Sequence, residues 1–475
     1  MQRSTGYRKE FIMDYTTIEE LMKKAHEAEG KTFGEIDTTD RLANAKSKGG
    51  LGQVIEESFF GYEVNSNAEA DFKHLGIELK VTAFKQNKNG SLSAKERLVL
   101  NIINYMEEVH THFETSSFWK KNEKLLLMFY EWVPGVDRKD FHITKSLLFT
   151  YPEADLEIIR QDWETIVNKI RVGKAHELSE GDTNYLGACT KGSNKNSLRS
   201  QPYSEIPAMQ RAFSLKPSYM TALVRRYHLN EELVSFTTTN ELKGKSLEEI
   251  LYSKFENYIG LTDQEIAQKL SIDYKPTTKS FVPLLVSSLL GIKGTRLDKI
   301  EEFAKANIEF KTVRLEPNGK PEQSMSFETI DFHQWTNESW EESEIRERFY
   351  QTKFLFVIFE FNQTKKENPN RKLYFKGIKL WNMPAPTIEK EIRELWEEVN
   401  KVIHEGIQIE YKKRGDKVVE ANNLPKINFN GVAHIRPKAR NGADKVTLPD
   451  GQHITKQCYW LNNSYIAQII NKTNK

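Results

Sequence analysis

The stretch KGGLGQVIEESFFGYEVNSNAEADFKHLGIELK, residues 48–80, ends in a pattern typical of a β-strand that continues into Thr82. Successive side chains of a strand point to opposite faces. Glu78 and Lys80 are therefore predicted to share one face of this strand. The other face, which should pack against a core, carries Ile77, Leu79 and Val81.

Two further carboxylates precede the strand. Asp71 lies seven residues before Glu78, across a predicted turn at residues 74–76. Residues 51–60 fit a helix with one apolar side, and Glu56 lies beside that side. The apolar side consists of Leu51, Val54, Ile55 and Phe59. Helix, turn and strand can thus bring three carboxylates to one place.

Three neighbouring carboxylates repel one another unless a cation lies between them. Oxygen ligands around a partly open site suit Mg²⁺, which keeps several waters and binds phosphate oxygens. A lysine two residues after a liganding glutamate, as Lys80 follows Glu78, can orient the attacking water or neutralise charge on the phosphorane. The pattern therefore indicates metal-assisted phosphodiester hydrolysis. Glu-x-Lys alone is more often a solvated strand face, so the prediction depends on all four residues and their spacing.

Composition limits the class of protein without naming a function. At 475 residues the chain is long enough for two domains, and 38% hydrophobic with 29% charged residues is ordinary for a globular protein. The net charge of +2 means that any nucleic-acid surface must come from local clusters of Lys and Arg. Cys189 and Cys458 are too far apart in sequence to indicate a zinc site or a disulfide framework. No apolar run reaches membrane-spanning length, so we expect a cytoplasmic protein with no membrane partner.

The chain contains an internal repeat with an offset of ~230 residues. Five segment pairs occur in the same order, which indicates tandem domains of one fold. The pairs are 17–22 with 246–251, 77–81 with 308–312, 125–131 with 354–360, 160–164 with 393–397, and 212–219 with 458–465. Each copy reads as helices and strands in a mixed α/β layer structure. We predict an N-terminal copy at residues 1–232 and a C-terminal copy at residues 240–475, joined through a polar stretch near residues 228–245.

The C-terminal copy keeps only part of the carboxylate pattern. Glu309 and Lys311 repeat Glu-x-Lys, and Glu302 aligns with Asp71. The segment aligned with Glu56, residues 283–291, carries no carboxylate. One active site is therefore expected, in the N-terminal copy.

The pattern KGxxGxxxE followed by D-x6-E-x-K inside GIELK resembles the mismatch-repair nicking enzyme MutH. The chain is still more similar to the Sau-type restriction endonucleases, which cut at GATC. That similarity extends over nearly the whole chain and is densest in the runs 93–105, 114–118, 173–181 and 210–216. The resemblance implies a restriction-endonuclease-like, MutH-like core in both copies, with a mixed sheet flanked by helices.

The resemblance also implies roles for individual residues. Glu56, Asp71 and Glu78 would be catalytic and hold Mg²⁺, and Lys80 would act with them. The MutH pattern places a second active-site lysine seven residues after Glu114, which is Lys121. Lys120 and Lys124 are close enough in sequence to be confused with Lys121, and a solvated surface lysine is the alternative reading.

The DNA-reading loop of the family corresponds to residues 185–201. Lys191, Lys195 and Arg199 lie in it with no acidic residue among them, which suits contacts to phosphates and base edges. A solvated loop is the alternative reading. Ser214 falls where the MutH pattern has a tyrosine, and we assign it to the same DNA-binding set.

The N-terminal copy departs from the family pattern at this loop. MutH has Arg-Pro-Lys where this copy has Cys189-Thr190-Lys191. The C-terminal copy keeps that run as Arg436-Pro437-Lys438, and arginine is the residue best suited to bidentate contact with guanine. The C-terminal copy is therefore expected to bind DNA as a catalytically inactive, allosteric domain.

The residues and the resemblance together predict a Mg²⁺-dependent type II restriction endonuclease that cuts both strands of duplex DNA, and the resemblance alone implies that it cuts at GATC. The resemblance implies a restriction–modification system, with a cognate DNA methyltransferase as functional partner and a dimer on DNA. Two alternatives remain: a strand-nicking repair endonuclease and a non-catalytic DNA-binding regulator. MutH-type chains have a single copy, which disfavours the first alternative. The retained Glu56 disfavours the second.

Overall fold

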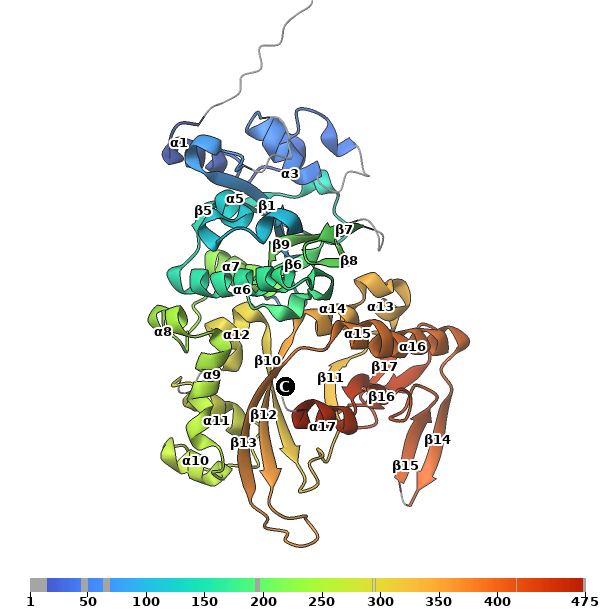
Figure 1. The fold of residues 1–475 in the computed structure, drawn as a ribbon. Coiled ribbons are helices and arrows are strands. Elements are labelled where there is room, and N and C mark those ends of the chain that lie inside the picture. Colours follow the sequence, from blue (N-terminus) through green and yellow to red (C-terminus); the bar gives the residue numbers. More distant parts are fainter. Residues whose placement is uncertain are drawn as a thin grey trace, which may run out of the picture. The chain divides into compact units, whose positions relative to one another are not determined.

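The computed structural model describes residues 15–43, 50–62, 69–192, 197–292, 294, 296–415 and 417–472. The chain forms two compact units, Met1–Leu247 with Ala304–Asn307, and Glu248–Phe303 with Ile308–Lys475. Each unit combines mixed or antiparallel sheets with helices, which confirms the predicted α/β class (Figure 1). The limits predicted for the two copies, residues 1–232 and 240–475, stay a prediction.

The central sheet of the N-terminal copy has the strand order β2-β1-β4-β5. Its strands are β1 Ile77–Gln86, β2 Leu92–Ala94, β4 Lys124–Glu131 and β5 Ile143–Thr150. β1 runs parallel to β4, and the other two pairings are antiparallel. Helices α1 Ile18–His26, α2 Phe33–Ile36 and α3 Gly50–Val54 contribute to the apolar cluster that also contains Leu126 and Met128 of β4.

A second sheet of the N-terminal copy has the order β3-β9-β6. It consists of β3 Leu98–Ile102, β9 Arg211–Leu215 and β6 Leu186–Thr190, and the hairpin β7 Leu198–Gln201 with β8 Ser204–Met209 follows β6 in sequence. The buried Asp162 accepts hydrogen bonds from the backbone N–H groups of Asn184, Tyr185 and Leu186 at 2.6–2.9 Å. These bonds fix the start of β6. The other helices of this part are α4 Tyr105–Glu108, α5 Ser117–Asn122, α6 Glu153–Arg171, α7 Pro217–Leu229 and α8 Thr239–Gly244.

The C-terminal copy repeats both sheets, the first with three strands in place of four among the described residues. β10 Ile308–Leu315 runs parallel to β12 Lys353–Phe361, which pairs antiparallel with β13 Leu373–Trp381. The second sheet, in the order β11-β19-β16, consists of β11 Met325–Thr329, β19 Gln457–Leu461 and β16 Ala433–Pro437. Two hairpins join β14 Ile409–Arg414 to β15 Lys417–Asn422 and β17 Lys445–Thr447 to β18 His453–Thr455.

The helices of the C-terminal copy include several short ones. They are α9 Leu247–Phe255, α10 Asp263–Lys269, α11 Phe281–Leu289, α12 Glu301–Ala306, α13 Phe332–Asn337, α14 Glu344–Gln351, α15 Ala385–Thr387, α16 Arg393–Glu405 and α17 Asn463–Asn471. One large apolar cluster includes residues of β12, α16 and β19. Across the described residues, none of the helices combines the length and the apolar character that crossing a membrane requires.

The strand registers show that the two copies are built alike. Ile77 lies opposite Lys124 at the start of the parallel pair, and Ile308 lies opposite Lys353 in the same way. In the second sheets Leu186 faces Leu215, and Ala433 faces Leu461. The repeat found in the sequence is therefore a repeat of strand pairing.

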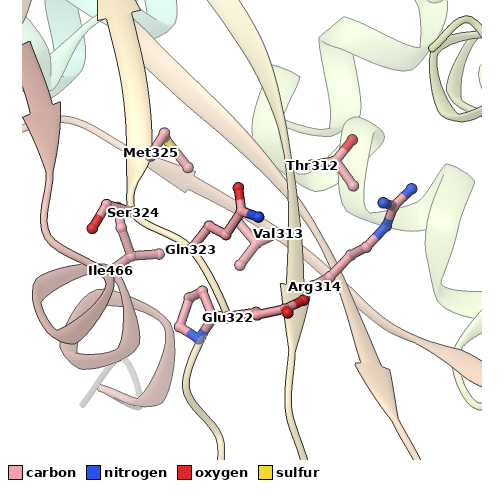
Figure 2. A pocket seen from close by; sticks show the side chains of 9 residues that line it. Thr312, Val313, Arg314, Glu322, Gln323, Ser324, Met325 and Ile466 are labelled. Atoms are coloured by element: carbon pink, nitrogen blue, oxygen red, sulfur yellow. The ribbon is translucent and has the colours of Figure 1, made fainter. Parts of the chain in front are cut away.

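A pocket of about 360 Å³ lies in the C-terminal copy, between β10 and the segment 321–325. Figure 2 shows Arg314, Glu322 and Gln323 among its polar side chains, together with Ile466 of α17. Neither Glu309 nor Lys311 lines it. The pocket is thus separate from the remnant of the carboxylate pattern.

Candidate active site

Glu78 and Lys80 lie side by side on β1, as the alternation predicts. Lys80 Nζ is 2.7 Å from Glu78 Oε1 and also donates to the carbonyl oxygen of Leu100 in β3 at 3.4 Å. Glu78 is only 3% exposed and the Lys80 side chain 16% exposed. The face that carries them is therefore covered, not solvated, because α5 packs against β1 and Lys80 reaches across to β3.

Asp71 is held next to Glu78 by the turn between them. The predicted turn is a short 3₁₀ turn, Lys73–Leu75, that ends at Gly76 with φ +63°. A left-handed φ of this kind costs glycine little and other residues more. The Asp71 carboxylate accepts the N–H of Leu79 at 3.0 Å, and the Asp71 N–H donates to Glu78 Oε2 at 3.3 Å.

Glu56 lies on a helix that changes its winding at this point. The predicted helix is α3 followed by a π-helical turn, Ile55–Phe59. The predicted apolar side is confirmed, since Leu51, Val54, Ile55 and Phe59 are buried. π-turns inside α-helices often occur at functional sites, and here the turn begins one residue before Glu56.

The charges of the site are out of balance. Burial, followed by the nearby Glu78 carboxylate, raises the pKa of Asp71 to about 7. Burial also raises the pKa of Glu56, with Glu78 adding to the rise and Lys80 opposing it. When all three are ionised, the carboxylates outnumber the two lysines that contact Glu78, which are Lys80 and Lys121. A cation bound among them would lower the free energy of the ionised forms.

The structure distinguishes Lys121 from its neighbours. α5 begins after Ser116, whose hydroxyl accepts the N–H of Trp119 at 3.0 Å. From this helix Lys121 Nζ comes within 3.6 Å of Glu78 Oε1, and its side chain is 15% exposed. Lys120 is exposed to solvent. The helix therefore brings Lys121 to the carboxylates.

The donor set fits a hard divalent cation. Carboxylate oxygens at a partly buried site are the ligands of Mg²⁺, which uses one or two carboxylates and completes its shell with water. Within the described ranges no three His, Cys, Asp or Glu side chains are close enough together to form a preformed metal cluster. Glu78 is instead engaged by Lys80 and by the Asp71 N–H. Glu56, Asp71 and Glu78 are the residues that would hold the ion.

Tyr62 is a site residue that the sequence reasoning missed. Its hydroxyl is buried and has no hydrogen-bond partner among the residues that the structure describes. Burial raises its pKa, and the carboxylates of Asp71, Glu56 and Glu78 raise it further. The Tyr62 ring packs edge-on against the Phe72 ring, with 5.6 Å between the ring centres. The backbone N–H of Tyr62 donates to the Glu56 carbonyl oxygen at 3.1 Å. No periodicity marks Tyr62, so only the fold reveals it.

The C-terminal copy places its carboxylates differently. Glu302 lies buried in helix α12, where the N-terminal copy has the 3₁₀ turn after Asp71. α11 carries no carboxylate where Glu56 would align. Glu309 is paired with Lys311 at 2.5 Å and with Arg348. This second Glu-x-Lys belongs to a network of ion pairs.

The predicted DNA-reading residues of the N-terminal copy lie in and beside β6 and the β7–β8 hairpin. Lys191, just after β6, and Arg199, on β7, are exposed. Lys195 lies outside the described residues. Ser214 is 1% exposed at the centre of the β3-β9-β6 sheet, and its hydroxyl has no hydrogen-bond partner in the part of the chain that is described. As placed, the Ser214 hydroxyl does not reach the surface.

Arg436 and Lys438 are exposed at the end of β16 and just beyond it. The Arg436 guanidinium lies 5.3 Å from the centre of the Trp460 ring. Arg436 faces Cys458 in its ladder as Cys189 faces Ala212, so the two residues occupy equivalent positions. The surface arginine of this position is thus present in the C-terminal copy and replaced by a buried cysteine in the N-terminal copy.

Comparison with known proteins gives matches to each copy. The family model of DNA mismatch repair enzyme MutH matches residues 60–162 and again residues 295–394. The type II restriction enzyme Sau3AI of Staphylococcus aureus is 37% identical over 96% of this chain and 99% of its own length. MutH of Shewanella woodyi is 30% identical over 38% of this chain and 78% of its own, and MutH of Shigella flexneri is 26% identical over 45% and 94%. The two family matches confirm a tandem of MutH-like domains.

Proposed function

The chain belongs to the family of the type II restriction enzyme Sau3AI, and we propose that it is a Mg²⁺-dependent endonuclease that cuts both strands of duplex DNA at GATC. The observation that carries this proposal is that Asp71, Lys80 and Lys121 all contact Glu78, with Glu56 near enough to raise the pKa of Asp71. Such a set is what metal-assisted hydrolysis of a phosphodiester requires.

Each residue of the cluster has a role that follows from its position. Glu56, Asp71 and Glu78 would hold Mg²⁺, which when bound supplies an activated water and charge neutralisation at the phosphate. Lys80 is held against Glu78 at 2.7 Å and can donate to the attacking water or to a phosphate oxygen. Lys121, whose Nζ lies 3.6 Å from the same Glu78 Oε1, can stabilise the negative charge that develops on the phosphorane.

The C-terminal copy is proposed to bind DNA without cutting it. Arg436 and Lys438 are exposed where the family pattern reads DNA, and the copy has no carboxylate aligned with Glu56. Lys191, Lys195 and Arg199 would contact DNA in the N-terminal copy. A double-strand break by one active site per chain requires two chains or two visits, which supports a dimer on DNA. A cognate methyltransferase as functional partner and a cytoplasmic location are parts of the same proposal.

Plasmid digestion tests the function. Plasmid DNA is incubated with the full chain in Mg²⁺ and, in parallel, in excess EDTA, and the ends of the products are sequenced. We expect double-strand ends only at GATC, and no cleavage in EDTA. Products nicked in one strand would favour the repair-type nicking enzyme. Binding to GATC DNA without any cleavage would favour a non-catalytic regulator.

A further inference from the structure

The C-terminal copy has a two-stranded ribbon, β14 with β15, that the N-terminal copy lacks among the described residues. Its strands form a sheet of their own, in which Ile409 lies opposite Asn422. Figure 1 shows the ribbon projecting away from the rest of this copy. At the same point, after α6, the N-terminal copy has two 3₁₀ turns, Ala175–Glu177 and Glu180–Asp182. The ribbon is therefore an addition to the shared fold.

The ribbon is anchored to the neighbouring hairpin, β17–β18. Lys445 of β17 donates to the Tyr411 hydroxyl of β14 at 2.9 Å and lies 2.9 Å from Glu420 Oε2 of β15. The other oxygen of Glu420 accepts the Thr455 N–H of β18 at 2.8 Å. An isolated two-stranded hairpin is only marginally stable in water. These bonds therefore help to fix the ribbon in position against β17–β18.

The β17–β18 hairpin also adjoins the exposed Arg436 and Lys438. The Lys438 N–H donates to the carbonyl oxygen of Lys456, the residue directly after β18, at 2.9 Å. The Lys456 side chain pairs with Asp444 at 2.6 Å, and Asp444 precedes Lys445. The ribbon, the β17–β18 hairpin and the end of β16 are thus joined by one series of contacts.

Positive charge is concentrated in this part of the chain. Residues 406–456, between α16 and β19, contain ten Lys or Arg and five Asp or Glu, whereas the whole chain has a net charge of only +2. The equivalent stretch of the N-terminal copy, residues 172–210, contains four of each kind. A local excess of positive charge attracts the phosphate backbone of DNA. Charge complementarity therefore favours DNA as the partner of this surface.

The side chains of the ribbon are free to meet such a partner. Lys412 and Lys413 are exposed. Lys412 lies 2.8 Å from Glu410, but both side chains are 60% exposed, and exposed ion pairs contribute so little that a phosphate can replace the carboxylate. Tyr411 and Val418 are 61% and 68% exposed. A two-stranded β-ribbon fits the major groove of B-DNA.

The length of the ribbon exceeds that of the recognition sequence. Strands of six residues at about 3.3 Å per residue span about 20 Å. Four base pairs of B-DNA span only about 14 Å. DNA bound at Arg436 and Lys438 would therefore meet the ribbon at base pairs outside GATC.

We propose that the ribbon, residues 409–422, is a DNA-binding arm whose lysines bind phosphates of the base pairs that flank the GATC held by the C-terminal copy. The inference rests on the proposed DNA binding by this copy and adds a contact region outside the recognition sequence. The N-terminal copy, which has turns in place of the ribbon, makes no such contact.

Photo-crosslinking in the full chain tests the arm. The two native cysteines, Cys189 and Cys458, are buried, so a thiol introduced at an exposed position can be labelled selectively with benzophenone maleimide. Val418→Cys places the label on the ribbon, and Ala443→Cys places it between Lys438 and β17. Lys366→Cys, in the exposed connection between β12 and β13, is the control.

Each variant also carries Glu78→Ala, so that the DNA stays intact, and is irradiated with a saturating duplex that contains one GATC. We expect Val418→Cys to crosslink to flanking base pairs, Ala443→Cys to crosslink to DNA as well, and Lys366→Cys to give little product. A duplex that ends next to GATC should lose the Val418→Cys product alone.

The other outcomes separate the arm from the proposed function. DNA crosslinks from Ala443→Cys without any from Val418→Cys would overturn the arm and leave DNA binding by this copy standing. Crosslinks from neither position would overturn that binding as well. Val418→Cys products that join two protein chains would make the ribbon a contact between copies instead. Equal DNA yields from Val418→Cys and Lys366→Cys would show that the contact is nonspecific and would also overturn the arm.

A second experiment tests whether the lysines bind phosphates. Lys412→Ala/Lys413→Ala is compared with Lys365→Ala/Lys366→Ala, which also removes two adjacent exposed lysines of the C-terminal copy. In the same cleavage-deficient background, the DNA concentration that gives half-maximal crosslinking from Ala443→Cys reports binding to this copy. The slope of its logarithm against the logarithm of salt concentration should fall by about one for each ribbon lysine that contacts a phosphate. The control pair should leave the slope unchanged, and an unchanged slope in the ribbon variant would contradict the proposal.

Discussion

Lys121 and Lys120 are adjacent in sequence but differ in what they contact. Lys121 comes within 3.6 Å of Glu78, and Lys120 is exposed on the same helix. Lys121→Ala should lower the single-turnover rate of DNA cleavage by about a hundredfold, the scale of removing one donor from a charged transition state. Lys120→Ala should stay within about threefold of the unmodified enzyme, because a solvated lysine contributes little. The reverse ranking of the two variants would move the second active-site lysine to Lys120.

The residue at position 214 leads to a prediction about whether adenine methylation blocks cleavage. The residue is small and buried at the centre of its sheet, where the MutH pattern has a tyrosine. A tyrosine at this position would extend further than serine, whereas the buried Ser214 does not reach the surface and so offers nothing for a methyl group on the adenine N6 to clash with. Plasmids with and without adenine-methylated GATC should therefore be cut at similar rates. Complete protection of the methylated plasmid would contradict this prediction.

Spacing and resemblance predicted the candidate site residues Glu56, Asp71, Glu78, Lys80 and Lys121, whose roles stay a prediction. The structure brings Asp71, Lys80 and Lys121 into contact with Glu78. The burial of Glu78 was not predictable, since the alternation rule assumes that one face is solvated and a parallel central strand is covered on both. Arg348 was not predicted from the sequence, because α14 is longer than α5. If the two copies are aligned on the first residues of their parallel strands, Lys124 and Lys353, then Lys121 corresponds to Tyr350 and not to Arg348.

At the scale of single elements, Asp162 on α6 positions β6, the strand that leads to the proposed DNA-reading loop. Its carboxylate accepts three backbone N–H bonds at the start of β6. Asp162→Ala removes the carboxylate that accepts these three backbone N–H groups and should lower the free energy of unfolding of the N-terminal copy by about 3 kcal/mol. Asp162→Asn keeps part of the acceptor set and should cost less. Calorimetry on both variants measures the loss, and an Ala variant as stable as the parent would show that water replaces the carboxylate.

The whole molecule is a pair of equivalent folds with different ion pairs. The repeat was predictable from five segment pairs, and the strand registers bear it out. The ion pairs that distinguish the copies were not predictable, because they join side chains from elements far apart in sequence. Arg348 Nε, for example, lies 3.0 Å from Glu328 Oε1 on β11, and Tyr459 on β19 donates its hydroxyl hydrogen to Glu328.

If the C-terminal copy binds a second GATC, cleavage should depend on the number of sites. A plasmid with two sites should be cut faster than a matched plasmid with one. Arg436→Ala should remove that advantage while one-site cleavage continues, because it removes a coupling free energy and not the chemistry. The rates are compared at fixed salt. Equal rates on both plasmids, with no effect of Arg436→Ala, would leave the C-terminal copy as a scaffold.

The most direct test of one active site per chain compares the two Glu-x-Lys pairs. Glu78→Ala, Lys80→Ala, Glu309→Ala and Lys311→Ala are made separately in the full chain, and single-turnover cleavage of a one-site GATC plasmid is followed in Mg²⁺. The account predicts at least about a hundredfold loss for the Glu78 and Lys80 variants, and largely intact strand hydrolysis for the folded Glu309 and Lys311 variants. Equal losses from both pairs would contradict it.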